Sequence, residues 1–375
     1  MLRRAIALPL LLVTSSGVPA CGSDGLDVPA CSEATLFRFT PVPLDTVAFV
    51  APIGEMAPVG GSPLPKGHTG FALNAANVAV VSPGDLVITD IRETTYVVSP
   101  SRQGYSDYSV FYAVCDGVEG HFGHLASLAP EILAKASGAA CQEYETVDET
   151  IRSCDVRTNI AVAAGAALGT AGTPPHSPSL DVGMTDSSVQ NFVNPGRYDQ
   201  KNAVCPWDHY ESALRDSILD RVGDGITSIT ESPRCGAMAI DLDGTAQGRW
   251  TLKSAPADGG DPTAGDFFVL APNPYAPESQ VVISTRIGAL DVATLPAFPV
   301  GGESGRVNPA ASAITADGLI YCYVSDPATA AYSFLVQLGG DELRVEKRVH
   351  ATGASPCAAA PETWTLSAAA VDLIR

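Results

Sequence analysis

Basic residues are scarce in this sequence, which has 22 Lys and Arg against 41 Asp and Glu and a net charge of −19. Nucleic acids bind proteins through a basic surface, so this composition argues against a nucleic-acid partner. The sequence also lacks a Gly-x-Ser-x-Gly nucleophile elbow, a P-loop and a dinucleotide fingerprint. The chain therefore lacks the signature residues of serine hydrolases of that type, of P-loop NTPases and of dinucleotide-binding enzymes.

Apolar runs of membrane-spanning length are absent, since none reaches the ~18 residues of a membrane helix. A short apolar stretch at 5–13 follows two arginines and precedes small residues, which predicts a secretory signal peptide over residues 1–20. Residues 18–21 resemble a bacterial lipoprotein signal, in which Cys21 is lipidated. We therefore expect secretion across the inner membrane into the bacterial cell envelope. The mature chain would be anchored to the membrane through lipid on Cys21, or periplasmic if the signal is simply cleaved.

Closely spaced cysteines are also absent, because the nine cysteines form no Cys-x-x-Cys pair, which argues against a zinc–cysteine site. With Cys21 lipidated, eight cysteines remain, and an even number in a secreted chain indicates up to four disulfides. Many pairings are possible, so the choice rests on proximity in the sequence. The predicted bonds are Cys141–Cys154, Cys205–Cys235, Cys322–Cys357 and, as the remaining pair, Cys31–Cys115.

Glycine and proline are abundant, with 35 and 29 residues, which favours short strands and turns over long helices. Segments rich in β-branched and aromatic residues are frequent, and from about Cys235 they follow one another to the C-terminus. We predict a mainly β chain with an N-terminal β-domain over 46–200. A β-sandwich or barrel is expected over 233–375.

Helical and irregular segments connect these parts. The connector 201–232 is predicted to contain a helix capped by Asp208 and ended by Gly223, since apolar residues recur every four positions between them. A second helix is predicted over 127–137. Residues 21–45 are rich in Gly, Ser, Asp and Pro and are expected to form a tether.

Three of the six histidines stand in distinctive surroundings. His68 lies in a Gly-His-Thr-Gly-Phe segment, and His124 in a Gly-His-Leu segment. His176 comes after a glycine-rich stretch at 162–172 and shortly before Asp181. In this order, and with a hairpin-like segment at 80–87, the motifs resemble the active-site skeleton of the lysostaphin-type (LytM-like) zinc endopeptidases.

The resemblance covers roughly residues 48–186 and implies a duplicated-hybrid-motif β-fold. Members of that family cut peptidoglycan cross-links. They bind zinc through a His-x-x-x-Asp motif and through one histidine of a closing His-x-His, and a histidine before leucine is catalytic. Further segments at 191–198, 205–207, 244–250 and 318–323 are similar to a two-domain group of uncharacterised bacterial envelope lipoproteins. That similarity implies the architecture and location, and no activity for the second domain.

The chain departs from the family pattern at the zinc ligands. His68 matches the first ligand, but Ala72 stands where the family has aspartate. His124 matches the catalytic histidine, and His121 is expected on the opposite face of its strand, since strand side chains alternate. No His-x-His follows, and Pro178 or Ser179 takes the place of the closing ligand.

The remaining candidates for a metal site are His68, His176 and Asp181, a set that we interpret as vestigial. Catalytic zinc generally needs three protein ligands and an open water position. We therefore predict a pseudo-peptidase without a cofactor, which binds peptidoglycan or another envelope protein. The alternatives are an active zinc metalloendopeptidase, in which His124 is the acid–base residue, and a scaffold that uses the C-terminal domain for protein contacts.

The disulfide prediction can be tested on the secreted protein. Thiol titration of the denatured, unreduced mature chain should find at most one free thiol, because eight cysteines are paired and Cys21 carries lipid or remains alone. Several free thiols would overturn the predicted framework.

Overall fold

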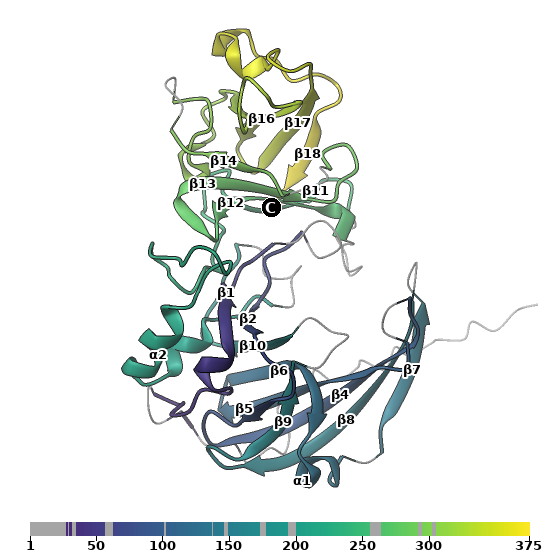
Figure 1. Ribbon diagram of the computed structural model, residues 1–375. Helices are drawn as coiled ribbons and strands as arrows, with labels where there is room; N and C mark the ends of the chain where they lie inside the picture. Colours follow the sequence, from purple (N-terminus) through teal and green to yellow (C-terminus); the bar gives the residue numbers. More distant parts are fainter. Residues whose placement is uncertain are drawn as a thin grey trace, which may run out of the picture.

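The computed structural model describes residues 28, 30–31, 35–56, 63–100, 103–136, 138–145, 149–172, 178–193, 200–255, 264–291, 295–301 and 305–375. The predicted signal peptide, the lipidation site Cys21 and the candidate ligand His176 lie outside these residues. The described chain forms two antiparallel sheets, which lie one above the other in Figure 1. The prediction of a mainly β protein is confirmed.

The first sheet has ten strands, and its last strand in sequence lies in its interior, between β2 and β6. They are β1 (Val47–Ala51), β2 (His68–Leu73), β3 (Val78–Val81), β4 (Leu86–Val98), β5 (Ser106–Cys115), β6 (Val118–Leu128), β7 (Ala140–Glu145), β8 (Thr150–Val162), β9 (Ala167–Ala171) and β10 (Ser179–Asp186). The order is β1-β2-β10-β6-β5-β4-β8-β7, and β9 joins β6 to β3. Because β10 pairs with both β2 and β6, three distant parts of the sequence meet there.

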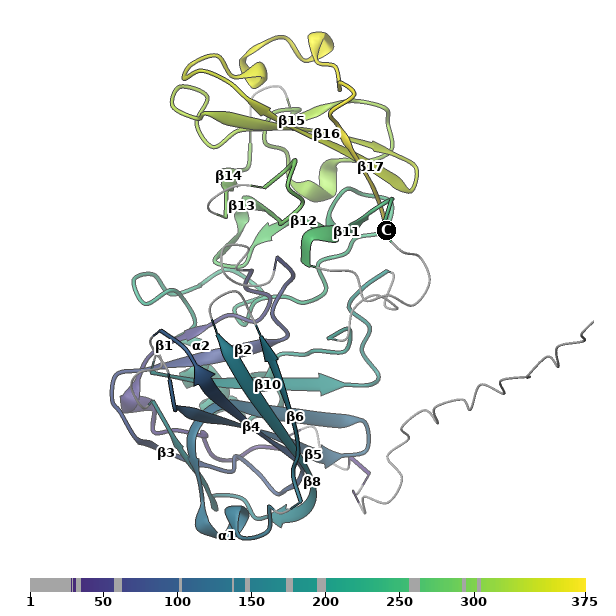
Figure 2. The ribbon, with the colours of Figure 1, turned by 90° about the vertical axis from the view of Figure 1, so that its right-hand side faces the viewer.

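The second sheet has eight strands and curls until its two edges approach each other. They are β11 (Gly248–Leu252), β12 (Phe267–Asn273), β13 (Ala276–Thr285), β14 (Ala297–Pro299), β15 (Tyr321–Tyr323), β16 (Tyr332–Gly339), β17 (Glu342–Val349) and β18 (Val371–Ile374). The order is β14-β13-β12-β11-β18-β17-β16-β15. Phe298 of β14 and Tyr323 of β15 belong to opposite edges, yet their ring centroids are 5.4 Å apart. The sheet is therefore nearly barrel-shaped, and β15–β17 lie over β12 and β13 in Figure 2.

Helices are short throughout the described residues. They are α1 (Pro130–Leu133), α2 (Ser212–Leu219) and the 3₁₀ helices η1 (Leu44–Thr46), η3 (Pro206–His209), η4 (Ala264–Asp266), η5 (Ala311–Ala313), η6 (Pro356–Ala358) and η7 (Pro361–Thr363). No helix among them has the length and apolar character that crossing a membrane requires.

The helix predicted over 127–137 is wrong in most of its length. Ser127, the residue at which that helix was expected to begin, belongs to β6 and pairs with Thr170 of β9. Helix α1 starts only at Pro130 and lasts four residues. The hydrogen-bond ladder with β9 satisfies the backbone that the helix would have used, so the tertiary pairing outweighs the local pattern.

The connector helix is shorter than its apolar spacing predicts. Asp208 does not cap it, because Asp208 lies in the 3₁₀ helix η3, and the N-cap position of α2 is Glu211. Trp207, in the same 3₁₀ turn, is fully buried, with its ring centroid 5.1 Å from that of Phe71. Because Trp207 packs against the first sheet, the turn that contains it remains a separate 3₁₀ helix, η3, and does not continue into α2.

All four predicted disulfides are present. Their pairs are Cys31–Cys115, Cys141–Cys154, Cys205–Cys235 and Cys322–Cys357. Such bonds persist in oxidising compartments, so the set is compatible with an extracytoplasmic location. The three tryptophans, Trp207, Trp250 and Trp364, are buried.

The two sheets share a continuous hydrophobic core. Residues of the outer face of the second sheet, among them Phe267 and Val269, belong to the same buried cluster as Ile240 and Met56. The opposite face of the second sheet encloses its own cluster, which includes Phe298. Because apolar surface is buried between the sheets, the second sheet packs firmly against the first.

The barrel closure predicts a large stability cost for Phe298→Ala. This side chain is completely buried, and truncating a buried Phe costs about 3–5 kcal/mol. Val349→Ala is the control, because Val349 is 77% exposed and such changes stay within about 0.5 kcal/mol. Denaturant unfolding followed by tryptophan fluorescence measures both. Equal midpoints for the two variants would show that the aromatic contact between the edges contributes nothing.

Candidate functional site

The candidate site lies on one face of three adjacent strands of the first sheet, β2, β10 and β6. In the pairing of β10 with β2, Gly183 faces His68 and Asp181 faces Gly70. In the pairing of β10 with β6, Gly183 faces His121. Directly paired residues of a sheet share a face, so His68, His121 and Asp181 lie on the same side. The alternate residues, such as Leu180 and Val182 of β10, are buried in the core on the other side.

A bulge in β6 brings His124 onto this same face. Tyr108 pairs with Leu125, but Val110 pairs with Phe122, so β6 has two residues where β5 has one. His124 takes up the extra length with a positive φ of 63°, as occurs in bulges and turns. The expectation that His121 and His124 lie on opposite faces is therefore wrong, because the bulge reverses the alternation after Phe122.

Two carboxylates flank the His124 ring. Its Nδ1 lies 2.8 Å from Oδ2 of Asp107 on β5. Its Nε2 lies 3.3 Å from Oδ2 of Asp181, and the same oxygen is 3.4 Å from Nε2 of His68. Sequence reasoning missed Asp107, which is buried and has no motif around it that distinguishes it from other strand residues. We call this hollow, lined by His68, His121, His124 and Asp181, the histidine groove.

The carboxylates keep His124 protonated. The hydrogen bond with Asp107 has the largest effect on the pKa of His124, and the one with Asp181 the next largest. Together they raise it from 6.5 to about 10. Burial alone would raise the pKa of Asp181, but the hydrogen bond and charge of His124 outweigh it and hold that pKa below its ordinary value. At neutral pH the groove therefore contains an imidazolium between two carboxylates.

The other two histidines are neutral at neutral pH. Burial lowers the pKa of His68, and the charge of Asp181 opposes this only in part. Burial lowers the pKa of His121 to about 4, and His68 adds to the effect. The His121 ring lies over Gly183, where an added Cβ would be 2.0 Å from its Cε1. A side chain at position 183 would clash with the His121 ring, so the ring can occupy this position only because residue 183 is glycine.

The described residues do not fit the zinc site that the family resemblance implies. Ala72 faces Ser179 across the strand pair, so the position of the missing ligand carboxylate holds a methyl group opposite a hydroxyl. The Asp181 carboxylate is already paired with His124. Within the described part of the chain, no group of three or more His, Cys, Asp or Glu side chains is arranged to hold a metal ion. His176 lies outside that part.

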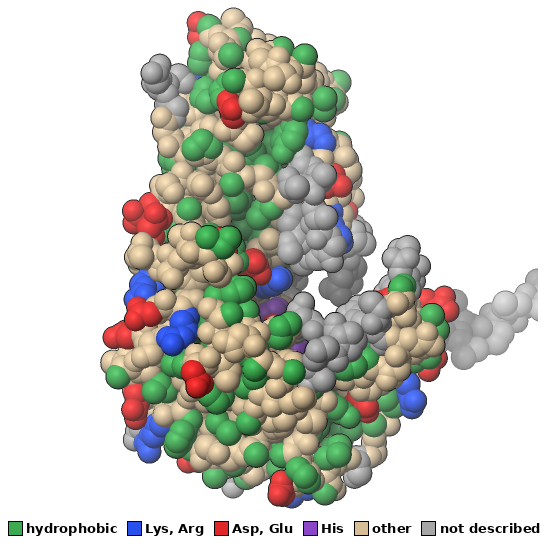
Figure 3. Space-filling model, viewed as in Figure 1, with side chains coloured by type: hydrophobic (Ala, Val, Ile, Leu, Met, Phe, Trp, Pro, Cys, Tyr) green, Lys and Arg blue, Asp and Glu red, His purple; other side chains and the backbone are tan. Residues whose placement is uncertain are grey.

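The groove is open to solvent. Exposed fractions are 25% for the His68 side chain, 24% for Asp181 and 41% for His124, so a ligand could reach all three. Figure 3 shows histidine side chains in a hollow of the surface between the two parts of the molecule. The site therefore offers an exposed cation, a carboxylate and neutral imidazoles within one depression.

No protein-family model matches this chain, and neither does any curated protein. The resemblance to lysostaphin-type endopeptidases therefore stays a prediction from the motifs.

The His124 network predicts an imidazolium that persists at alkaline pH. Because the folded-state pKa is raised from 6.5 to about 10, the stabilisation is complete below pH 6.5 and is lost as the pH rises through about 10. NMR of the histidine rings should show His124 still protonated at about pH 8, while His121 stays neutral. In Asp107→Asn the pKa of His124 should fall, because the first hydrogen bond loses its charge. An ordinary titration of His124 near pH 6.5 in the unchanged protein would contradict this account.

Proposed function

We propose that this is an exported bacterial envelope protein, a pseudo-peptidase of lysostaphin-like fold, which binds peptidoglycan peptides in the histidine groove without cutting them. The observation that carries the proposal is the position of Asp181, which pairs with His124 instead of completing a metal site. The predicted duplicated-hybrid-motif fold, the signal peptide and the lipid on Cys21 belong to the same proposal.

The state of His124 supports binding over hydrolysis. A general base must accept a proton from the attacking water, and its pKa is best placed near the working pH. The His124 imidazole, with a pKa of about 10, already carries its proton at neutral pH. Catalytic zinc would need three ligands and a free position, and the described residues supply no such set.

The floor of the groove supports an extended peptide as the ligand. Gly70 and Gly123 lie on either side of Asp181 in the paired strands. Glycine within a strand commonly marks a place where a ligand or another backbone approaches closely. Peptide amide and carboxylate groups could then hydrogen-bond to Asp181 and His124, whose side chains are partly exposed.

Retention on purified peptidoglycan sacculi tests binding. We expect the full chain to sediment with sacculi and His124→Ala to be retained about 10-fold less or weaker still, since hydrogen bonds to charged groups contribute about 1.5–3 kcal/mol. His350→Ala is the matched control, because His350 bonds Ser333 in the second sheet, outside the groove. Retention no greater than that of a carrier protein would rule out this ligand.

Metal analysis tests for a zinc site on the same full chain, which includes His176. After incubation with zinc and desalting, we expect well under one ion per chain. One zinc per chain that His68→Ala abolishes would show instead that the chain is a metalloprotein, and the endopeptidase alternative would then replace the pseudo-peptidase proposal.

A further inference from the structure

The segment that leads into His68 is tied to the end of β1. Glu55 and Lys66 pair through their backbones, since Gly54 N–H donates to Lys66 O and Lys66 N–H to Glu55 O, each at 2.9 Å. Their side chains also form an ion pair, with 2.9 Å between Lys66 Nζ and Glu55 Oε2. Lys66 is two residues from His68, so the position of Glu55 bears directly on the start of β2.

A tyrosine of the second sheet reaches the same glutamate. Tyr275 lies in the turn between β12 and β13, and its hydroxyl donates to Glu55 Oε1 at 2.6 Å. Burial, together with the charge of Glu55, raises the pKa of Tyr275 far above its ordinary value, so the hydroxyl stays a neutral donor. Each oxygen of Glu55 thus holds one group, and we call Tyr275, Glu55 and Lys66 the interdomain clasp.

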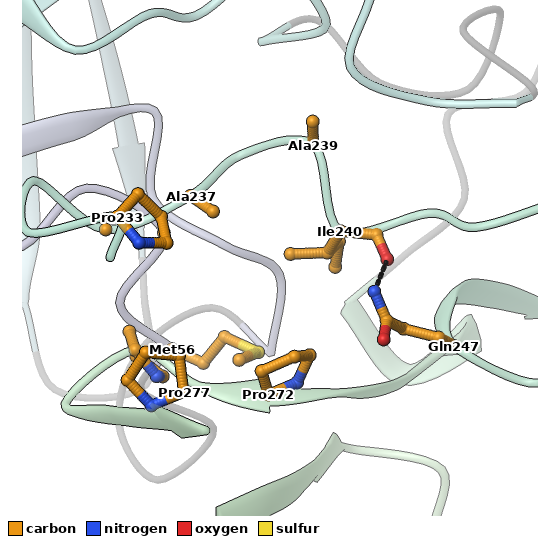
Figure 4. A pocket seen from close by; sticks show the side chains of 11 residues that line it. Met56, Pro233, Ala237, Ala239, Ile240, Gln247, Pro272 and Pro277 are labelled. Carbon is orange, nitrogen blue, oxygen red and sulfur yellow. Dashed lines mark hydrogen bonds between the residues drawn. The ribbon is translucent and has the colours of Figure 1, made fainter. Parts of the chain in front are cut away.

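Apolar residues lie beside the clasp, although the Glu55 and Lys66 side chains themselves are 28% and 36% exposed. Gly54 and Met56, which flank Glu55, line a small cavity of about 80 Å³ together with Pro272, Pro274 and Pro277, which flank Tyr275. Figure 4 shows Met56, Pro272 and Pro277 around the cavity, while the Gln247 amide donates to the Ile240 carbonyl. Proline has no N–H to donate, so these residues offer Glu55 no competing backbone hydrogen bond. The clasp is therefore a directional contact in an interface that is otherwise mainly apolar.

We propose that Tyr275 is a positioning residue of the histidine groove, which holds His68 in place through Glu55 and Lys66. The second sheet then forms part of the binding site, because it fixes one wall of the groove without touching the ligand. A second contact also ties the second sheet to the segment before β2: Ser284 Oγ of β13 donates to the carbonyl of Pro63 at 2.7 Å. The expected effect on ligand binding rests on the proposed function, whereas the positioning of His68 does not depend on it.

The first test needs no ligand. Tyr275→Phe keeps the ring and removes the donor, so the His68 ring signal in a ¹H–¹³C NMR spectrum, assigned with His68→Ala, should shift. Tyr321→Phe is the matched control, because the Tyr321 hydroxyl makes a hydrogen bond of the same kind, 2.6 Å to Asp317 in the loop before β15. It should leave the His68 signal unchanged. An unmoved His68 signal in Tyr275→Phe would overturn the proposal.

A double-mutant cycle tests the route of the effect. Glu55→Ala should shift the His68 signal as well, and the double variant should add little to it, because both changes break one connected set of contacts. Shifts that add fully would overturn the clasp, since Tyr275 and Glu55 would then act independently.

Retention on sacculi links the clasp to ligand binding. We expect Tyr275→Phe to bind about threefold to tenfold more weakly than the unchanged chain, which is less than the full effect of losing a hydrogen bond to a charged group, because Tyr275 does not touch the ligand. Tyr321→Phe should bind normally. If the unchanged chain does not bind sacculi while the His68 signal still shifts in Tyr275→Phe alone, the proposed ligand is wrong and the positioning role stands. Normal binding by Tyr275→Phe would overturn the part played by the second sheet in the site.

Discussion

Strand β10 forms hydrogen-bond ladders with β2 on one edge and with β6 on the other, and this double pairing determines the chemistry of the groove. Strand side chains alternate, so a slip of one residue would exchange the groove face of β10 for its core face. Leu180 and Val182 are buried on the core side, and each such side chain stabilises the register by about 1.5–3 kcal/mol. Packing in the core thus holds Asp181 in the groove.

The position of Asp181 changes what the neighbouring histidines can do. In the arrangement that the family resemblance implies, this part of the sheet would supply ligands to a metal ion. Here one carboxylate oxygen lies within 3.4 Å of both His68 and His124, and Asp107 lies on the far side of the His124 ring. The positive charge of the protonated His124 ring stabilises the two carboxylates, Asp107 and Asp181, as a metal ion would. The site is therefore polar, with a positive charge held between two negative ones.

The second sheet contributes more than a separate folded unit would. Its outer face shares a hydrophobic core with the first sheet, and Tyr275 and Ser284 both bond to the chain between β1 and β2. The apolar contact supplies most of the attraction between the sheets, while the two hydrogen bonds add direction. Glu55 and Pro63, both within that segment, are thus bonded to residues more than two hundred positions later in the sequence.

Sequence alone determined which residues are available and much of their local conformation. The strand-rich composition and all four disulfides were predictable, because short loops favour pairing of cysteines that are near in sequence and the last pair followed from the remainder. Two histidines of the groove, His68 and His124, and the carboxylate Asp181 were also identified from their motifs. What only the tertiary structure decided is which of these side chains meet. The bulge at His124, the partnership with Asp107 and the pairing of Ser127 with β9 depend on strands distant in sequence. A local pattern carries no information about such partners, because register and bulges are settled by the packing of the whole sheet.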